Sequence, residues 1–345
     1  MSITFAIIKV GILATISFVV AMAWTPALTH FLYKYKLGKS IRSASESPIY
    51  AKLHAHKSGT PVMGGLLVWV TTVVLALVLA ALGVWFDGIF AKLSFLTRSE
   101  TLLPLGALVA SAVVGLVDDY WNVRKIGAHG GGLRARHRLL IYSVIAAVGA
   151  WWFYFKLEWT QFQIPFLGVF DIGWWYIPLF FLVIVATAFS VNETDGLDGL
   201  AGGTLLTGFA AYGAIAFSQG RFDLAAFCGV IAGALLAFLW FNIMPARFFM
   251  GDTGAMSLGV TLGVVAMLTN TALLLPVIGI VFVVESISVI IQVLSKKFRG
   301  KKVFLSAPIH HHLEAIGWPE PKIVMRAWVI SAVAAVIGVV LALVD

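Results

Sequence analysis

The chain has 345 residues, of which 60% are hydrophobic and 12% charged, and its formal net charge is +8. A soluble domain is usually about a quarter charged, so this composition excludes a protein whose whole surface faces water. The single cysteine, Cys228, excludes an intrachain disulfide and a cysteine metal cluster, and we expect no redox chemistry.

Apolar runs of about 20 residues, the length that crosses a bilayer as a helix, recur along the sequence. Lipid cannot satisfy open backbone groups, and no alternating barrel pattern is present. We therefore predict an all-α, polytopic integral membrane protein with about ten transmembrane helices in a single domain, residues 1–345. The expected spans are 5–32, 62–85, 101–117, 138–155, 174–190, 200–218, 222–242, 254–270, 273–295 and 323–343.

The first span is expected to be retained rather than cleaved as a signal peptide, because only Lys9 precedes an apolar core that continues to Leu32. Residues 157–176 fit either a loop or an interfacial segment. With ten spans, nineteen of the 24 lysines and arginines fall in the odd-numbered loops. The positive-inside rule makes those loops cytoplasmic. They cover about 34–61, 118–137, 191–199, 242–253 and 296–322, and we predict that function resides there.

The second span begins after Lys57 with a glycine-rich stretch, Gly59–Gly65. Unpaired N–H groups at a helix N-terminus favour anions, although the spacing is not that of a P-loop. Close packing against neighbouring helices explains the glycines equally well.

Two adjacent carboxylates, Asp118 and Asp119, follow the third span. Adjacent acids near a bilayer repel each other unless a cation neutralises them, and Mg²⁺ binds through one or two carboxylates together with substrate phosphates. The pair therefore indicates a metal or base site, with a hydrated helix end as the plainer alternative.

The short loop from Asn192 to Gly199 holds three acids and one amide. Such groups bind a ribose, a base edge or a metal, whereas an acidic solvated turn is the simpler interpretation. Asn242 ends the seventh span, and the next loop carries Phe249 and Asp252. An aromatic ring can stack on a nucleobase, and Asp252 can complete a hard-cation site with the earlier acids. An exposed Gly-Asp turn is the alternative.

In the ninth span, Pro276 is expected to bend the helix. Glu285 and Gln292, seven residues apart, are expected to point into the protein, either for function or as a structural hydrogen-bonded pair.

The last inner loop carries a basic run and then three consecutive histidines, His310, His311 and His312. Because neighbouring side chains cannot all point the same way, a triple-histidine metal site is disfavoured. Histidines beside a phosphate can donate hydrogen bonds or protons, while the basic run suits orientation and anionic lipid.

These five inner segments resemble, in order, the polyprenyl-phosphate N-acetylhexosamine-1-phosphate transferase superfamily, and within it the branch of phospho-N-acetylmuramoyl-pentapeptide transferases. The branch-level signal is Ala307–Glu314 followed by Gly317–Lys322. The resemblance covers nearly the whole chain. It implies a ten-helix enzyme, usually a homodimer, in the bacterial cytoplasmic (inner) membrane. Such an enzyme joins UDP-N-acetylmuramoyl-pentapeptide to undecaprenyl phosphate with Mg²⁺ and yields lipid I and UMP. Membrane lipid is an expected partner and nucleic acid is not.

The resemblance also implies residue roles. The implied catalytic residues are Asp118, Asp119, Asp252, His310, His311 and His312, and the three aspartates are also the implied Mg²⁺ ligands. The implied substrate-binding residues are Lys57, Asn192, Asp195, Asp198, Asn242, Phe249 and Gln292. The family commonly has a lysine three positions after the second aspartate, where this chain has Asn122; Lys125 or Arg138 is expected to supply that charge.

Some alternatives remain open. Asp118 is the candidate base, but a double displacement through an aspartyl phosphate is also chemically possible. A related transferase would use UDP-N-acetylglucosamine or another UDP-hexosamine. A secondary transporter would place its ionisable residues near the bilayer midplane, and a scaffold protein would have no need of acids and histidines gathered on one face.

Overall fold

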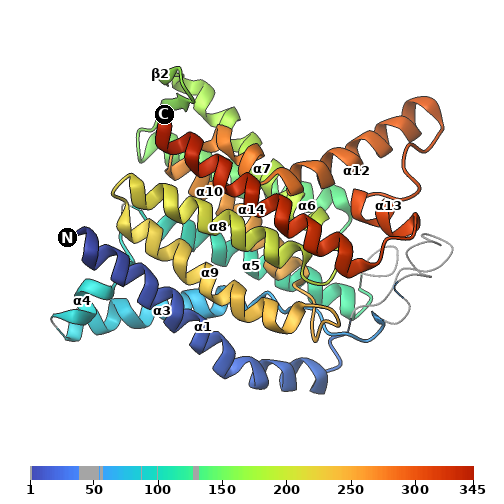
Figure 1. Ribbon diagram of the computed structural model, residues 1–345, viewed down its shortest axis with the longest axis horizontal. Helices are drawn as coiled ribbons and strands as arrows, with labels where there is room; N and C mark the ends of the chain where they lie inside the picture. The colour runs from blue at the N-terminus through green and yellow to red at the C-terminus, as the bar shows by residue number, and fades with distance from the viewer. Residues whose placement is uncertain (1, 39–53, 55–56, 87, 99, 127–131) are drawn as a thin grey trace.

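The computed structural model describes residues 2–38, 54, 57–86, 88–98, 100–126 and 132–345. Most of the expected loop 34–61 and the glycine-rich residues 127–131 lie outside this described part. The long helices run between two ends of one bundle (Figure 1). Both chain termini lie at one end, and the short helix α13 lies at the other, which we call the inner end.

Helices dominate the described residues. Their bounds are α1 Ile3–Lys34, α3 Leu66–Trp85, α4 Ile89–Leu93, α5 Leu102–Val123, α6 Ala135–Phe155, α7 Tyr176–Thr194, α8 Leu200–Ser218, α9 Phe222–Asn242, α10 Gly251–Leu268, α11 Leu275–Ile278, α12 Ile280–Arg299, α13 Ile309–Ala315 and α14 Glu320–Val344. Nine described helices are long and apolar enough to cross a membrane, and the broken pair ending in α12 brings the number to ten. The predicted all-α, multi-pass membrane fold is confirmed.

The core of the bundle is α10, in which every residue from Thr253 to Leu268 is buried. It packs between α5 and α7. A Cβ added at Gly115 of α5 would collide with the backbone carbonyl of Asp252, so only glycine allows this approach of the two helices. The close packing sets the start of α10 beside the acidic end of α5.

Three helices extend further toward the inner end than the apolar pattern predicts. Asp118 and Asp119 lie inside α5 rather than after it, Asn192 lies inside α7, and Asp252 lies in the first turn of α10 rather than in a loop. The polar side chains find partners on neighbouring segments, as described below, so the helices need not end where hydropathy falls.

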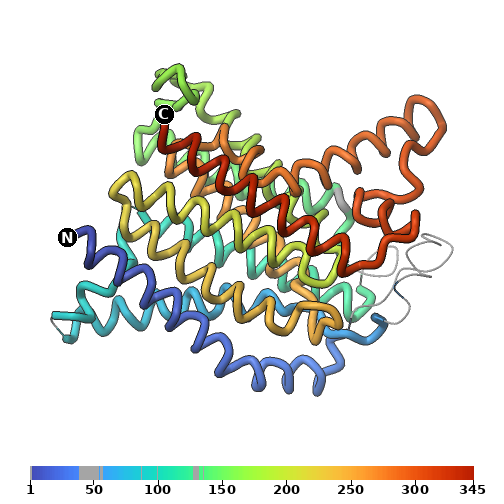
Figure 2. Tube along the Cα trace, in the orientation of Figure 1, coloured from blue at the N-terminus to red at the C-terminus, as the bar shows by residue number. Residues whose placement is uncertain are grey.

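The ninth span is broken, as Figure 2 shows where α12 leaves the bundle. The helical segments on either side of Gly279 differ in direction by 84°. A bend was expected in this span, but its assignment to Pro276 is wrong. Pro276 lies in the first turn of α11, where a proline needs no N–H partner and is tolerated, and the chain turns three residues later.

The helix after this break has a polar face turned inward. Its buried stripe is Glu285, Ser288, Gln292 and Ser295, and its exposed apolar stripe is Val284, Ile287, Ile291 and Leu294. Both stripes follow helical spacing. A helix that hides its polar residues from its surroundings and exposes its apolar ones is suited to lipid rather than water.

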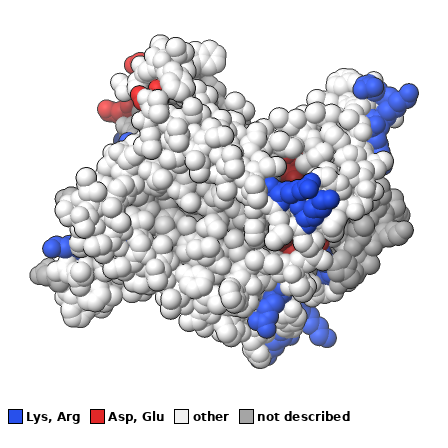
Figure 3. All heavy atoms as spheres, viewed as in Figure 1, with Lys and Arg blue, Asp and Glu red and all other residues white. Residues whose placement is uncertain are grey.

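Residues 157–176 contain a β-hairpin, in which β1 (Gln161–Ile164) pairs antiparallel with β2 (Gly168–Asp171). It lies at the end opposite α13 (Figure 1). On the face drawn in Figure 3, most lysine and arginine atoms lie toward the inner end, and a broad band without charged side chains covers the middle of the bundle. This distribution fits a bilayer around the middle.

Candidate active site

Asp119 holds the beginning of α10 in place. Its Oδ1 accepts the backbone N–H of Asp252 at 2.9 Å, and its Oδ2 accepts that of Thr253 at 3.0 Å. The first N–H groups of a helix have no partner within the helix, and a carboxylate there also suits the helix dipole. Asp119 therefore fixes the position of Asp252 through the backbone of α10.

Asp118 and Asp252 are joined by a single arginine. Arg138, from α6, contacts Asp118 Oδ2 through Nε at 2.8 Å and Asp252 Oδ2 through an Nη at 2.8 Å. Asn192 donates from Nδ2 to Asp252 Oδ1 at 2.6 Å. Four helices thus meet at one point, and Asp118 is fully buried there.

This arrangement fits a divalent cation. Hard cations such as Mg²⁺ take carboxylate oxygens, and Asp118 and Asp252 turn oxygens toward one positive group, the Arg138 guanidinium. Both oxygens of Asp119 accept backbone N–H groups of α10, whereas Asp118 and Asp252 each turn Oδ2 to a side chain, that of Arg138, which can move aside for a bound cation. The donor set therefore offers Asp118 and Asp252 as the two carboxylates nearest to a bound cation, with Asp119 behind them.

Lys57 is enclosed by two carboxylates rather than exposed at a helix N-terminus. Its Nζ lies 2.7 Å from Asp198 Oδ1 and 2.6 Å from Glu320 Oε1. Glu320 Oε1 also accepts the backbone N–H of Asp198 at 2.7 Å. We call Lys57, Asp198 and Glu320 the lysine clamp. Burial lowers the pKa of Lys57, but Glu320 and then Asp198 outweigh it, and the pKa is raised above its ordinary value.

Three other residues expected to bind substrate, Asp195, Asn242 and Phe249, brace this region. Asp195 Oδ2 accepts the backbone N–H of Gly251 at 3.1 Å. Asn242 accepts the N–H of Gly199 and donates to the carbonyl of Phe248. The ring of Phe249 lies 5.8 Å from Lys57 Nζ. Together they tie the segment before α8 to the start of α10.

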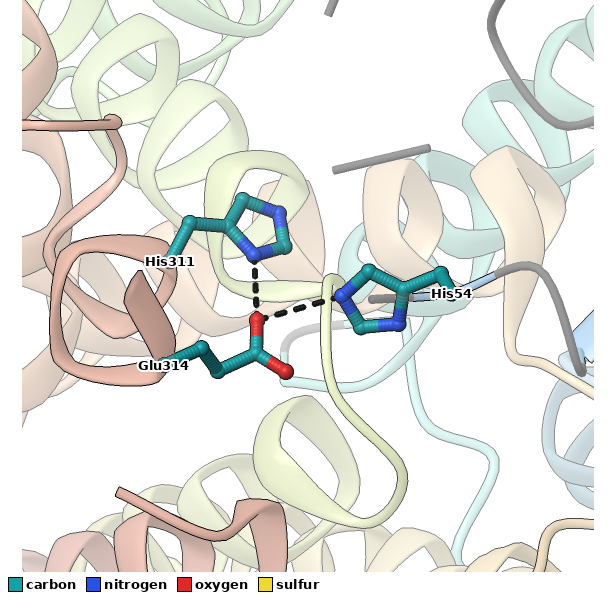
Figure 4. Close-up of side chains that lie close together, drawn as sticks. All are labelled: His54, His311 and Glu314. Carbon is teal, nitrogen blue, oxygen red and sulfur yellow. Dashed lines mark hydrogen bonds and ion pairs between the residues drawn. The ribbon is translucent and has the colours of Figure 1, made fainter. Parts of the chain in front are cut away.

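The three histidines point to three different partners, as the sequence argument expected. His310 Nδ1 lies 2.8 Å from Glu285 Oε2, and His312 Nδ1 accepts the backbone N–H of Leu305. His311 Nδ1 lies 2.8 Å from Glu314 Oε2, which is also 3.1 Å from His54 Nε2 (Figure 4). The carboxylate of Glu314 therefore links the segment before Lys57 to α13.

The pKa values of the neighbouring histidines His310 and His311 are shifted in opposite directions. Burial lowers the pKa of His310, but the carboxylates of Glu285 and then Glu314 and Glu193 raise it, so that it lies above the ordinary value. Burial and the neighbouring His310 lower the pKa of His311 to about 3. Burial raises the pKa of Glu314, yet hydrogen bonds from His311 and His54 lower it to about 2. The carboxylates around His310 therefore favour its protonated form, whereas His311 is neutral at neutral pH.

Gln292, an expected substrate-binding residue, contacts a loop rather than the aspartates. Gln292 is buried but binds the backbone of Val303 and Phe304, and so shapes the loop after α12. Glu285 and Gln292 do point inward, but they contact different partners and do not form a hydrogen-bonded pair with each other.

The family lysine that is missing at Asn122 had two candidate replacements. Of these, Lys125 is exposed and Arg138 contacts the acids.

Sequence reasoning missed His54, Glu314 and Glu320. Glu314 lies one helical turn after His311, a spacing at which side chains meet. Glu320 opens an apolar span, and an acid at a span end is costly unless it is paired. These two signals were present in the sequence, whereas no signal near His54 indicated its partner.

Comparison with known proteins places the chain in a family. A family model described as glycosyl transferase family 4 matches residues 101–270. A phospho-N-acetylmuramoyl-pentapeptide-transferase of Chloroflexus aggregans is 40% identical, over 96% of this chain and 89% of the relative. Relatives with the same name from Geobacillus thermodenitrificans and Shouchella clausii are 38% and 40% identical, over 94% of this chain and 95% and 94% of their own lengths. The chain therefore belongs to the phospho-N-acetylmuramoyl-pentapeptide-transferase family.

Proposed function

We propose that the chain transfers phospho-N-acetylmuramoyl-pentapeptide from UDP-N-acetylmuramoyl-pentapeptide to undecaprenyl phosphate, giving lipid I and UMP. The observation that carries this proposal is the convergence of Asp118 and Asp252 on Arg138, with Asn192 bonded to Asp252, in a chain about 40% identical to transferases of that name. A soluble donor and a lipid acceptor explain why a polar site lies at the end of a membrane bundle.

In this proposal the Asp118 and Asp252 carboxylates would hold Mg²⁺, which would supply charge neutralisation for the donor pyrophosphate. Arg138 adds a fixed positive charge beside them. A phosphate oxygen of the lipid attacks the β-phosphorus of the donor, the bond from that phosphorus to the bridging oxygen breaks, and UMP leaves. Phosphoryl transfer of this kind depends mainly on positioning and electrostatics.

Proton removal demands little of the protein, because a phosphate monoester has its second pKa near about 6. Asp118 is the proposed base that removes any remaining proton. The alternative is that Asp118 attacks the donor phosphorus as a nucleophile. Replacing Asp118 by Asn separates the two: near-normal rates at raised pH would rule out Asp118 as the nucleophile. The polyprenyl tail is proposed to lie along the exposed apolar stripe of α12.

The site is proposed to face the cytoplasm, because the positive-inside rule places the lysine- and arginine-rich inner end there. A cysteine introduced at exposed Lys297 of a Cys228→Ser variant should react with an impermeant maleimide in inverted vesicles and not in intact cells. The homodimer implied by the resemblance belongs to the same proposal, and light scattering on the detergent-solubilised protein measures it.

The decisive experiment supplies purified protein in nanodiscs with UDP-N-acetylmuramoyl-pentapeptide, undecaprenyl phosphate and Mg²⁺. Mass spectrometry should detect lipid I and UMP in equal amounts, and an Asp252→Asn variant is the matched control. Release of no UMP by the wild-type protein would reject the proposal. Equal turnover of UDP-N-acetylglucosamine would instead assign the chain to a different donor.

A further inference from the structure

The buried carboxylate of Glu285 has no place in the transfer reaction described so far. It lies in α12, is 3% exposed, and places Oε2 2.8 Å from Nδ1 of His310. The backbone N–H of His310 also points at this oxygen, at 3.4 Å. An ionised carboxylate only accepts hydrogen bonds, so the Nδ1 position of His310 is fixed as the donor.

The other ring nitrogen of His310 is the second unexplained feature. His310 is 1% exposed, and its Nε2 makes no hydrogen bond within the described part of the chain. A Cβ added at Gly196 would collide with this Nε2, so the nitrogen faces the Asn192–Gly199 segment. A buried polar atom without a partner is costly, and in a native structure such an atom calls for an explanation.

We propose that Glu285 is a positioning residue that acts through His310. It holds the imidazole with Nε2 directed at the Asn192–Gly199 segment, where Nε2–H donates a hydrogen bond to an anionic oxygen of the donor substrate, a phosphate oxygen or a sugar-phosphate oxygen. This inference rests on the proposed function and adds to it a residue that touches no substrate itself.

The charges around His310 support a protonated ring. Glu285 of α12, Glu314 of α13 and Glu193 of α7 are the acids that face it, and His311 is the neighbouring imidazole. Three carboxylates favour the imidazolium form, and in that form both ring nitrogens are donors. A carboxylate that fixes the ring of a histidine acting at its other nitrogen is a recurring device in enzymes.

The test replaces Glu285 by Gln in the full-length protein in nanodiscs. Since kcat reports groups that act in the substrate complex, we expect kcat to fall about 10- to 100-fold, with a smaller change in the KM for the donor. Activity that needs protonated His310 is lost as the pH rises through its pKa. Loss of the carboxylate lowers that pKa, so the alkaline limb of the pH–rate profile should move to lower pH.

Three further variants sharpen the test. Ser286→Ala is the matched control, because Ser286 is buried in the same helix and donates to Ser190 instead; it should keep the wild-type profile. Glu285→Asp keeps the charge on a shorter side chain. Compared with Glu285→Gln, it should have a higher kcat and an alkaline limb closer to the wild-type position. Gly196→Ala should displace the His310 ring and lower kcat while the limb stays close to the wild-type position.

The outcomes separate the alternatives. If Glu285→Gln unfolds more easily but keeps the wild-type kcat or the wild-type alkaline limb, Glu285 is only structural and the inference is wrong. If the Gln variant does not fold, Gly196→Ala decides, because it displaces the His310 ring and leaves the Glu285 carboxylate in the protein: a wild-type kcat would overturn the inference equally. A wild-type protein that releases no UMP would instead overturn the proposed function.

Discussion

The lysine clamp offers a sharp test of how the inner end is held together. In Lys57→Met, the buried carboxylates of Asp198 and Glu320 lose the cation that lies within 2.7 Å of each. Removing one partner of a buried ion pair costs about 3–5 kcal/mol, because an uncompensated charge remains. Methionine keeps most of the side-chain volume, so this cost reports charge rather than packing.

The measurement is unfolding in SDS, followed by the fluorescence of the chain's 12 tryptophans. Lys57→Met should lower the free energy of unfolding by about 3–5 kcal/mol. Adding Glu320→Gln removes one of the two stranded charges, and the two changes should couple by about 0.5–3 kcal/mol. Lys297→Met, at an exposed lysine of the inner end, is the control and should stay within about 0.5 kcal/mol of wild type.

The clamp also predicts a pH dependence. The pKa of Lys57 is raised in the folded protein above its ordinary value of 10.5, so its stabilisation is complete below that value and is lost as the pH rises through the folded pKa. The free energy of unfolding should therefore fall above about pH 10.5 more steeply in wild type than in Lys57→Met. Unchanged unfolding of Lys57→Met, with only KM raised, would refute the clamp and make Lys57 a substrate contact.

Three further predictions concern the aspartates. Arg138→Ala should lower kcat by about 10²–10³-fold, the usual loss of one charge-stabilising donor, and Arg138→Lys by less; equal kcat values in a UMP-release assay would contradict this. Gly115→Ala should push α10 away from α5 and cost about 1–3 kcal/mol, whereas Gly106→Ala, which meets nothing within 4 Å in the same helix, should be harmless in the same SDS titration. Chelation with EDTA should stop UMP release and added Mg²⁺ restore it, and activity surviving exhaustive chelation would remove the metal role of Asp252.

The sequence alone determined the class of fold and the location of the unusual residues. Long apolar runs in a chain with 12% charged residues require helices in a bilayer, because no other backbone arrangement without open edges fits the pattern. The count of basic residues then separates two sides. That the acids gather at one end follows from these facts, and the bonds from Asp119 and Asp195 to the start of α10 confirm it.

Only the tertiary structure decided which atoms meet. The partners of Lys57 lie 141 and 263 residues away in the chain, and Glu285 meets His310 from the helix that follows the 84° turn at Gly279. Hydropathy does not report such pairings, since the spacing of polar residues can mark the face of a helix that turns inward, as in α12, but not the residue that this face meets. The roles of Asp119 as the anchor of α10 and of Arg138 as the bridge between two aspartates are products of helix packing, which no local pattern in the sequence encodes.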